Sequence, residues 1–546
     1  MIFFKKKPIK EPYQIVAKIL IAIFLAIGLF IYKDYGISWD EMFQRSGGIA
    51  NLVFIYEYFD LYKILSYFFE NVPVPPDNLM SLSDLKNEKH LQRFYGVVFD
   101  LPVTLMEYFF FGISDDGQKI YQFRHLITFL IFVFGIWSLY LQAEKLFSSH
   151  MAGVLAMLLM MLSPRMFAEG FYNSKDIVFM CLISLGMLTL TNLTQNLTFK
   201  NILFHSLITA LAINTRLMGV LFLPLTIFVL FACAYAQKND ISNTVKFYLI
   251  YLLISIILTF IFFPYLWEAP IQSFVEAFQS MSKFPAESNT LYMGNLINVT
   301  ELPWHYIPVW MAATIPPFIT ILFTIGIGAL SINLIKKPQN IFNIRNILLI
   351  SNLGIILASI ATIILLNAVI YNGWRHMYFV YPAFIMISTY GFMFIFQKIK
   401  IWRYGTIVLT IVFSTFIGHQ LNWLVKAHPV QNVYFNFIVG SDWKKKFDMD
   451  YWGVGNHIMI KNILLNDKSE SISICAKSIT PLINTLRIMN LNDKKRIKLD
   501  CEDYPDYLLT NYIGVKQSKK LNLSGYKLFH QKKIFKEIII STYKKI

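Results

Sequence analysis

Charged residues are scarce in this sequence. They make up 15% of the 546 residues, whereas hydrophobic residues reach 56% and aromatic residues 16%. So small a fraction of charged residues, beside so large a hydrophobic fraction, excludes an ordinary soluble enzyme. Repeated runs that approach or exceed about 18 apolar residues indicate a polytopic helical membrane protein instead.

Acidic residues are scarcer than basic ones, 33 against 49, which leaves a net charge of +16. Many lysines and arginines lie in short segments between apolar runs, which is the pattern that sets membrane orientation. We therefore reject a nucleic-acid partner. The other basic residues concentrate in the C-terminal hundred or so positions, where they suit anionic lipid headgroups or a lipid phosphate.

Cysteine is also rare, with four residues. Cys181 and Cys233 fall in apolar runs and are expected to be buried packing residues. Cys475 and Cys501 lie in the polar C-terminal region, and whether they pair stays open. No Cys/His cluster has metal-binding spacing, so the sequence indicates no metal and no cofactor, and a divalent metal stays an open alternative.

The first apolar run, Ile15–Ile31, follows a short basic segment and lacks a small-residue cleavage site. It predicts an uncleaved first helix with a cytoplasmic N-terminus. About ten further spans follow. They are Tyr121–Leu141, Met151–Leu162, Ile177–Leu193, Ile202–Ile213, Met218–Tyr235, Phe247–Phe263, Ile307–Leu330, Ile347–Ile370, Tyr378–Phe396 and Tyr404–Leu424.

Alternation of these spans predicts two domains. Residues 1–425 form a transmembrane domain whose first external loop, about 32–119, holds two interfacial amphipathic pieces, Phe43–Phe69 and Leu91–Phe111. Residues 426–546 form a small extracytoplasmic α/β domain, with strand-like pieces at Ser471–Cys475, Tyr507–Leu509 and Ile534–Ile540. The expected location is the inner (plasma) membrane, with the tail opposite the N-terminus.

The same alternation places five segments outside, and each carries polar residues beside a membrane boundary, where ionisable groups often mark a site. The segments are Tyr32–Lys119, Pro164–Asp176, Thr215–Arg216, Pro264–Tyr306 and Tyr371–His376.

Two adjacent carboxylates open the first of these segments. Ser38 to Glu41 fits a capping box, in which Glu41 reaches back to the start of a helix, and this structural role is the one we favour for Glu41. Asp40 in the same first turn is kept ionised by the helix dipole and can act as a general base on a hydroxyl.

The other outward polar residues each have a plain alternative. Asp176 could cap a helix start, while Arg165, Lys175 and Arg216 could be boundary anchors. The loop Asn372–Tyr378 favours function, because its arginine and imidazole suit a phosphate and because a simple anchor is expected on the cytoplasmic side.

Several stretches of the chain resemble bacterial GT-C membrane glycosyltransferases, in the broad family 39 group that includes protein O-mannosyltransferases and aminoarabinose transferases. The stretches are Trp39–Glu41, Tyr172–Asp176, Gly373–Tyr378, His428–Asn436 and Asp450–Gly453. The resemblance implies transfer of a sugar from a polyprenyl-phosphate donor to a hydroxyl acceptor, with inversion, at the extracytoplasmic face. The acceptor could be a lipid, a glycan or a protein.

The resemblance also implies roles for individual residues. The base maps onto Asp40 and a second acidic position onto Asp176, while Arg375, His376 and, more weakly, Arg216 map near the donor phosphate. With Glu41 and Lys175 added from the loop patterns, the candidate catalytic residues are Asp40, Asp176 and Glu41, and the candidate phosphate-binding residues are Arg375, His376, Arg216 and Lys175.

The segment Pro264–Tyr306 is too short for the β-trefoil insert of the eukaryotic mannosyltransferases, which weakens the case for a protein acceptor. The main rival is a multi-span transporter or flippase of a lipid-linked or anionic substrate. It would favour matching halves and charges at mid-membrane, and this sequence has neither.

Overall fold

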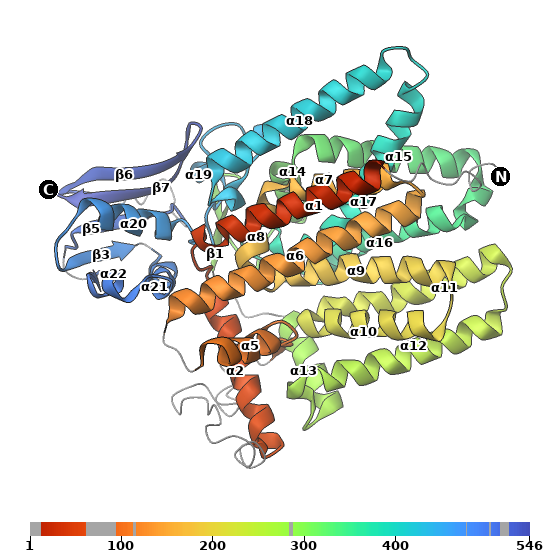
Figure 1. Cartoon of the computed structure of the whole chain (residues 1–546), viewed down its shortest axis with the longest axis horizontal. Coiled ribbons are helices and arrows are strands. Elements are labelled where there is room, and N and C mark those ends of the chain that lie inside the picture. Colours follow the sequence, from red (N-terminus) through yellow and green to blue (C-terminus); the bar gives the residue numbers. More distant parts are fainter. Residues whose placement is uncertain are drawn as a thin grey trace.

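The computed structural model describes residues 12–61, 94–112, 116–282, 288–476, 478–501, 504–513 and 523–546. These residues form a bundle of long helices with a small α/β unit at one end (Figure 1). Among them, nine helices are long and apolar enough to cross a membrane, or ten with one bent pair counted as a span. The expectation of a polytopic helical membrane protein with a small C-terminal α/β unit is confirmed.

The helices of the bundle follow the predicted apolar runs closely. They are α1 (Pro12–Ile31), α6 (Gly117–Phe147), α7 (His150–Met161), α8 (Pro164–Tyr172), α9 (Asp176–Gln195), α10 (Phe199–Thr215), α11 (Phe222–Gln237), α12 (Ile241–Ile261), α14 (Tyr306–Thr314), α15 (Pro317–Lys336), α16 (Ile344–Leu365), α17 (Tyr381–Ile399) and α18 (Gly405–Ala427). Short 3-10 helices adjoin them at η1 (Tyr32–Asp34), η3 (Leu217–Leu221), η4 (Pro264–Leu266), η5 (Pro338–Phe342) and η6 (Arg375–Val380).

Polar residues at the ends of the runs fix where several helices begin. A side-chain oxygen at the N-cap accepts a backbone N–H of the first turn in α6, α7, α10, α12 and α16. Such caps satisfy donors that the helix itself leaves unpaired. The capping residues are Asp116, Ser149, Thr198, Asp240 and Asn343.

Two predicted spans differ from the structure. The single span Ile307–Leu330 was wrong: α14 ends at Thr314 and α15 begins at Pro317, because prolines 316 and 317 offer no N–H and hold Ile315 extended. The short span Met151–Leu162 corresponds to α7, which continues after a bend of 72° into α8.

An element lies at each predicted span, although nine helices, or ten with the bent pair, are long and apolar enough to cross a membrane among the described residues. The nine long helices, the bent α7–α8 pair and the 17-residue α10 correspond to the eleven predicted spans. The residues that follow α1 meet the tail, since Tyr35 Oη donates to Gln431 Oε1 at 3.1 Å and His428 lies 2.9 Å from Asp34. The start of α1 is therefore at the opposite end of the bundle from the tail (Figure 1).

The loop predicted to be the first external one contributes two described helices, α2 (Glu41–Tyr58) and α5 (Asp100–Phe111), while residues 62–93 of the predicted amphipathic pieces lie outside the described residues. In Figure 1, α2 runs across the direction of the long helices, as an interfacial helix would. A buried ion cluster ties the two helices to α6: Glu107 meets Arg45 at 2.8 Å and Arg124 at 2.5 Å, and Arg124 also pairs with Asp100.

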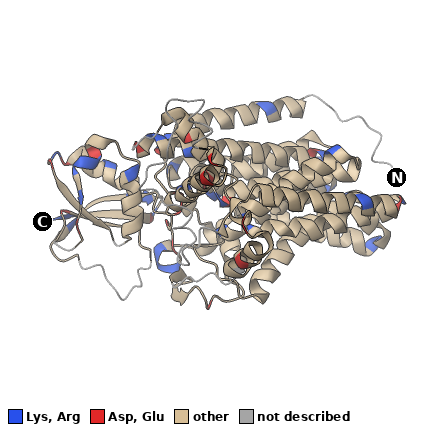
Figure 2. Ribbon diagram, turned by 90° about the horizontal axis from the view of Figure 1, so that it is seen from below, with Lys and Arg blue, Asp and Glu red and all other residues tan. Residues whose placement is uncertain are grey.

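Charged residues occur mainly at the ends of the long helices and around the junction with the α/β unit (Figure 2). The middle of the bundle is almost free of them in this view, which matches the cost of placing charge inside a membrane.

The C-terminal α/β unit is built on a five-stranded sheet in the order β4-β3-β5-β7-β6. β3 is parallel to β4 and β5, while β7 is antiparallel to β5 and β6. The strands are β3 (Ile472–Ala476), β4 (Ile497–Leu499), β5 (Tyr507–Thr510), β6 (Tyr526–Ile534) and β7 (Glu537–Lys545), and the helices are α19 (Trp443–Lys446), α20 (Asn456–Asn466), α21 (Ile479–Arg487) and α22 (Leu491–Lys495).

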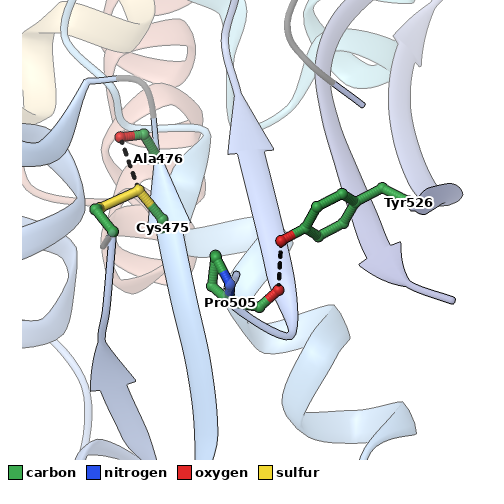
Figure 3. The surroundings of a disulfide bond; sticks show 5 residues. Cys475, Ala476, Pro505 and Tyr526 are labelled. Carbon is green, nitrogen blue, oxygen red and sulfur yellow. Dashed lines mark hydrogen bonds between the residues drawn. A yellow bond between two sulfur atoms is a disulfide. The ribbon is translucent and has the colours of Figure 1, made fainter. Parts of the chain in front are cut away.

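Two predictions about this unit meet different outcomes. Cys475 and Cys501 form a disulfide, which joins β3 to the residues after β4 (Figure 3). The strand-like piece Ile534–Ile540 was wrong, because it spans the turn of the β6–β7 hairpin, where Phe535 has a φ of 54°. Its apolar residues come from two strands rather than one.

The segment between α18 and α20 packs into the bundle. It contains η7 (Gln431–Val433) and η8 (Phe437–Val439), and several of its residues, Val430 to Val454, belong to the large apolar core of the long helices. Asn436 Nδ2 donates to the carbonyls of Ala312 and Ile315 at 2.6 and 2.9 Å, which fastens the segment to α14. The division at residues 425/426 stays a prediction.

Outside the sheet, α13 (Pro270–Ser282) and a β1–β2 hairpin (Asn289–Tyr292 and Asn295–Asn298) fill the segment before α14. Asp448 of the tail accepts hydrogen bonds from Thr290 Oγ1 and Leu291 N at 3.0 and 2.8 Å. The hairpin and the tail thus support each other at the same end of the bundle.

Candidate active site

Four of the predicted residues, from four different segments that were predicted to lie outside, meet in one chain of ion pairs. Nη1 of Arg375 lies 2.9 Å from Asp40 Oδ2 and 3.4 Å from Asp176 Oδ2. Arg216 pairs with the other oxygen of Asp176. Residues separated by up to 335 positions along the chain therefore share one polar cluster.

Asp176 is held from several directions at the start of α9. Its backbone N–H donates to Asn173 Oδ1 at 2.9 Å, and Asn173 Nδ2 donates back to Asp176 Oδ2 at 3.1 Å. The predicted helix start at Asn173–Asp176 is thus present. The side chain of Asp176 is 1% exposed, so its charge depends on Arg216 and Arg375 for compensation.

Asp40 lies at the residue before α2 and is 28% exposed, with Arg375 as its ion-pair partner. Its neighbour Glu41 faces a different way: Oε2 accepts the Ser38 backbone N–H at 2.6 Å, and Oε1 lies 2.9 Å from His125 Nε2. Glu41 is therefore a structural anchor and does not reach the Asp40–Asp176 cluster through any contact described.

The predicted capping box is only half formed. The helix begins at Glu41 rather than after Ser38, and the Ser38 hydroxyl donates to the Tyr172 carbonyl at 3.2 Å instead of to a helix N–H. The Ser38 hydroxyl is unavailable to the helix because it donates to this buried carbonyl at the end of α8. The glutamate half of the box keeps its predicted bond.

Arg375 and His376 begin η6, directly before α17. Two aromatic rings lie against the Arg375 guanidinium, with its Cζ 5.0 Å from the Tyr371 ring centre and 4.7 Å from that of Trp452. His376 contacts the ring of Tyr371, at 4.8 Å between ring centres. His376 also borders the cavity described below.

Lys175 lies beside this cluster with its ammonium over the ring of Tyr95. Burial lowers the pKa of Lys175 well below its usual range, and the nearby Arg216 lowers it further against the opposing pull of Asp40, Asp100 and Asp176. Lys175 therefore holds its proton weakly until another anion arrives.

An apolar cavity of about 310 Å³ adjoins the ion-pair cluster. Its polar wall consists of Tyr95, Arg216, Tyr371 and His376. Its apolar wall comes from η3, α13, the end of α16 and η6: Leu217, Met218, Val220, Leu221, Phe278, Met281, Ile363, Leu366, Val369, Met377 and Phe379. A ligand with a charged head and a hydrocarbon tail matches both walls.

Several buried nitrogens in the cavity wall and in the adjoining ion-pair cluster lack a partner among the described residues. They are Nε of Arg216 and Nε of Arg375, and Nδ1 of His376 is also unpaired. A buried unpaired polar group costs about 1–3 kcal/mol, more when it is charged. An anion bound here would relieve that cost.

Two groups of residues near the site were not assigned a role from the sequence. Glu169 accepts from Tyr378 Oη at 2.7 Å and from Tyr451 Oη at 3.3 Å, so it ties α8 to both η6 and the tail. Tyr95 and Tyr371 line the cavity. The signal for Tyr371 was its place beside the Asn372–Tyr378 loop, whereas no sequence pattern pointed to Tyr95.

The comparisons with known proteins agree with this picture. The sequence model of a family described as dolichyl-phosphate-mannose-protein mannosyltransferase matches residues 110–267, which run from the end of α5 to η4. This is less than half of the chain. No curated protein matches the chain in sequence.

Solved structures with a similar fold include ArnT from Cupriavidus metallidurans in the apo state, with a TM-score of 0.50 and 11% identity over 96% of this chain and 98% of that chain. ArnT bound to undecaprenyl phosphate gives 0.48 with the same identity and coverage. The apo oligosaccharyltransferase of Archaeoglobus fulgidus gives 0.46 at 11% identity over 74% of this chain, which spans only 56% of that protein. The expected resemblance to the GT-C superfamily of membrane glycosyltransferases is confirmed.

Proposed function

We propose that the protein transfers a sugar from a polyprenyl-phosphate donor to a hydroxyl acceptor at the membrane surface. The observation that carries this proposal is the ion-pair cluster that holds Asp40, Arg375 and Arg216 beside an apolar cavity, whose wall includes Arg216 and His376. The name of the matching family, which includes a lipid-phosphate sugar, supports the same donor class.

The reaction needs one base and one stabiliser of negative charge. Asp40 accepts the proton of the acceptor hydroxyl, whose oxygen attacks the anomeric carbon of the sugar. The bond from that carbon to the phosphate oxygen breaks, and the lipid phosphate leaves with one more negative charge than the donor carried. Attack from the face opposite the leaving phosphate inverts the anomeric centre.

The cationic residues stabilise the negative charge of the departing phosphate. Arg216 and Arg375 each have an unpaired Nε, and Lys175 takes up a proton more readily beside an added anion. Donors already aimed at the place where charge develops lower the barrier most. Asp176, which is buried and doubly paired, holds Arg216 and Arg375 in place and is assigned to positioning rather than to proton transfer.

Charge counting favours a donor with one phosphate. Asp40 and Asp176 are balanced by Arg216 and Arg375, so a protonated Lys175 leaves about one positive charge for the ligand. A phosphodiester carries one negative charge, whereas a pyrophosphate diester carries two. We propose on the same basis that the reaction uses no metal, so activity should survive chelators.

The experiment is sugar transfer by the purified full-length protein in lipid nanodiscs. Donors with a labelled sugar on polyprenyl monophosphate and on polyprenyl pyrophosphate are compared, with envelope lipids, envelope glycans and denatured protein as separate acceptors. We expect sugar transfer from the monophosphate donor. The Asp40→Asn variant should lose this transfer, and the signal that remains in it gives the background of the assay. A wild-type protein that consumes neither donor would contradict the proposal.

The same assay separates the alternative, a flippase of a lipid-linked substrate. A flippase would move the labelled donor across the bilayer without releasing its sugar, and Asp40→Asn would leave that movement intact because no hydroxyl has to be deprotonated. We do not favour it, because the charged cluster sits at the helix ends rather than at mid-membrane.

A further inference from the structure

The C-terminal tail reaches the site through Trp452. Its indole is 1% exposed and lies 4.7 Å from the Arg375 guanidinium carbon. The turn that presents it depends on Gly453, whose φ of 71° is unfavourable for other residues, and on Asp450, which accepts the Gly455 N–H at 2.8 Å.

The tail reaches the same site a second time through Asn484 of α21. The amide nitrogen of this fully buried side chain lies 3.3 Å from each of two carbonyl oxygens, those of Ser38 and Trp39. These carbonyls directly precede Asp40. A side chain from 445 positions away thus fixes the backbone that presents the carboxylate.

The residues before Asp40 pack closely against the tail around these contacts. A Cβ added at Gly36 would lie 2.7 Å from the Val454 carbonyl oxygen, nearer than real Cβ contacts allow. One residue later, Ile37 packs in a small apolar cluster with Ile488, at the end of α21. The tail therefore meets residues 36 to 39 in succession.

The physical need for such support lies in Arg375. A single nitrogen of this long side chain serves both Asp40 and Asp176, so its geometry has to be fixed by something other than its two partners. Flat aromatic contact restricts a guanidinium without removing its hydrogen bonds. Displacement of a reacting group by about 1 Å can lower a rate by about 100-fold.

We propose that Trp452 and Asn484 are positioning residues, through which the C-terminal tail completes the transferase site: Trp452 orients Arg375, and Asn484 orients the Ser38–Asp40 turn. This inference rests on the proposed function. Neither residue touches the reacting atoms. The tail thereby acts as part of the catalytic machinery and not only as a covering domain.

The first test compares variants of Trp452 in the transfer assay. Trp452→Leu is expected to lower kcat by about 10- to 100-fold, while Trp452→Phe, which keeps a ring on Arg375, restores it to within about threefold. The indole nitrogen has no hydrogen-bond partner among the described residues, so the phenylalanine sacrifices no bond.

The matched control is Trp443→Leu. Trp443 is another buried tail tryptophan, but its ring packs on Phe435 rather than on Arg375. We expect its melting temperature to fall as much as that of Trp452→Leu, with kcat within about threefold of wild type. Equal loss of kcat in both leucine variants, or full activity in Trp452→Leu, overturns the role of Trp452.

The second test uses Asn484→Ala with Thr485→Val as its control. Thr485 is equally buried, and its hydroxyl donates to the Pro481 carbonyl at 2.8 Å within α21, away from Asp40. We expect Asn484→Ala to lower kcat by about 10-fold or more with little change in the donor KM, because the donor-phosphate residues are untouched. A rise in KM without a fall in kcat would contradict a role in positioning Asp40.

Hydrogen–deuterium exchange separates this inference from the proposed function, since it needs no activity. In the unliganded full-length protein, Asn484→Ala should speed amide exchange over residues 37–44, and Thr485→Val should not. If wild-type protein transfers no sugar but this exchange difference is present, the proposed function falls and the positioning contact stands. If exchange is unchanged, the positioning role of Asn484 is refuted whatever the activity.

Discussion

Asp40 and Asp176 share one donor, Nη1 of Arg375, but their surroundings differ. Asp176 is 1% exposed and is also paired with Arg216 and with the Asn173 amide, whereas Asp40 is 28% exposed with Arg375 as its ion-pair partner. A buried carboxylate that already accepts from three partners is less accessible to a substrate hydroxyl than a partly exposed one. The difference supports the proposed division of roles, in which Asp40 accepts the proton and Asp176 holds the two arginines.

The largest expected effect is that of Asp40→Asn, which removes the base and keeps its shape. We expect kcat for sugar transfer to fall by about 10²- to 10⁴-fold, the usual range for a lost general base. Asp40 is 28% exposed, and Arg375 keeps its ion pair with Asp176, so we expect a smaller loss of thermal stability than for Asp176→Asn, and the melting temperature serves as the control. If Asp40→Asn kept its turnover, Asp40 would not be the base, and Asp176 would be the next candidate.

Asp176→Asn should sharpen the contrast by damaging stability as well as rate. Removing one member of a buried charge pair leaves the other uncompensated and costs about 3–5 kcal/mol in unfolding free energy. We expect a lower melting temperature and a raised donor KM, because Arg216 and Arg375 lose their common anchor. A variant as stable as wild type that loses only kcat would indicate that Asp176 acts in proton transfer.

The sequence predicted which residues belong to this site, but not how they pair with one another. Asp40, Asp176, Arg216 and Arg375 could be found because each follows or precedes an apolar run, and the ends of such runs are visible without a structure. Which of them pair could not be read, because pairing depends on how helices far apart in sequence pack.

Partners from the tail were beyond the sequence for the same reason. Trp452 belongs to a stretch that resembles the family, but nothing in its spacing places it on Arg375, and Asn484 lies in a segment with no motif. Local chemistry also overrode periodicity twice. Pro316 ended an apolar run that counts as one span, and the turn at Phe535 split an apolar piece that counts as one strand.

Arg216 offers a smaller effect that separates the two arginines. Arg216 lines the cavity and pairs only with Asp176 among the two aspartates, whereas Arg375 touches both. We expect Arg216→Gln to raise the donor KM by about 10-fold, the value of one charge-assisted hydrogen bond to phosphate, with a smaller change in kcat. Arg403→Gln, in the exposed turn before α18, is the control. A pure kcat effect would place Arg216 with Asp40 rather than with the donor.

The smallest effect concerns Lys175, which lies in the field of both aspartates. Burial lowers the pKa of Lys175 in the empty site, and a bound phosphate anion raises it, so donor binding takes up a proton. Affinity is then greatest below the lowered pKa and declines as the pH rises through it toward the pKa of the bound state. We expect the donor KM of wild type to rise severalfold as the pH is raised through the lowered pKa of Lys175, in the range below the ordinary lysine pKa.

Lys175→Arg breaks this link, because a guanidinium stays protonated throughout that range. The donor KM of Lys175→Arg should change little with pH. Lys175→Met should bind the donor weakly, with a high KM, at every pH. Lys119→Arg, at an exposed lysine of α6, should keep the wild-type profile. If Lys175→Arg kept the full pH dependence, the proton taken up on binding would belong to another group. His376 would be the first to test, because it lines the cavity and its Nδ1 has no partner among the described residues.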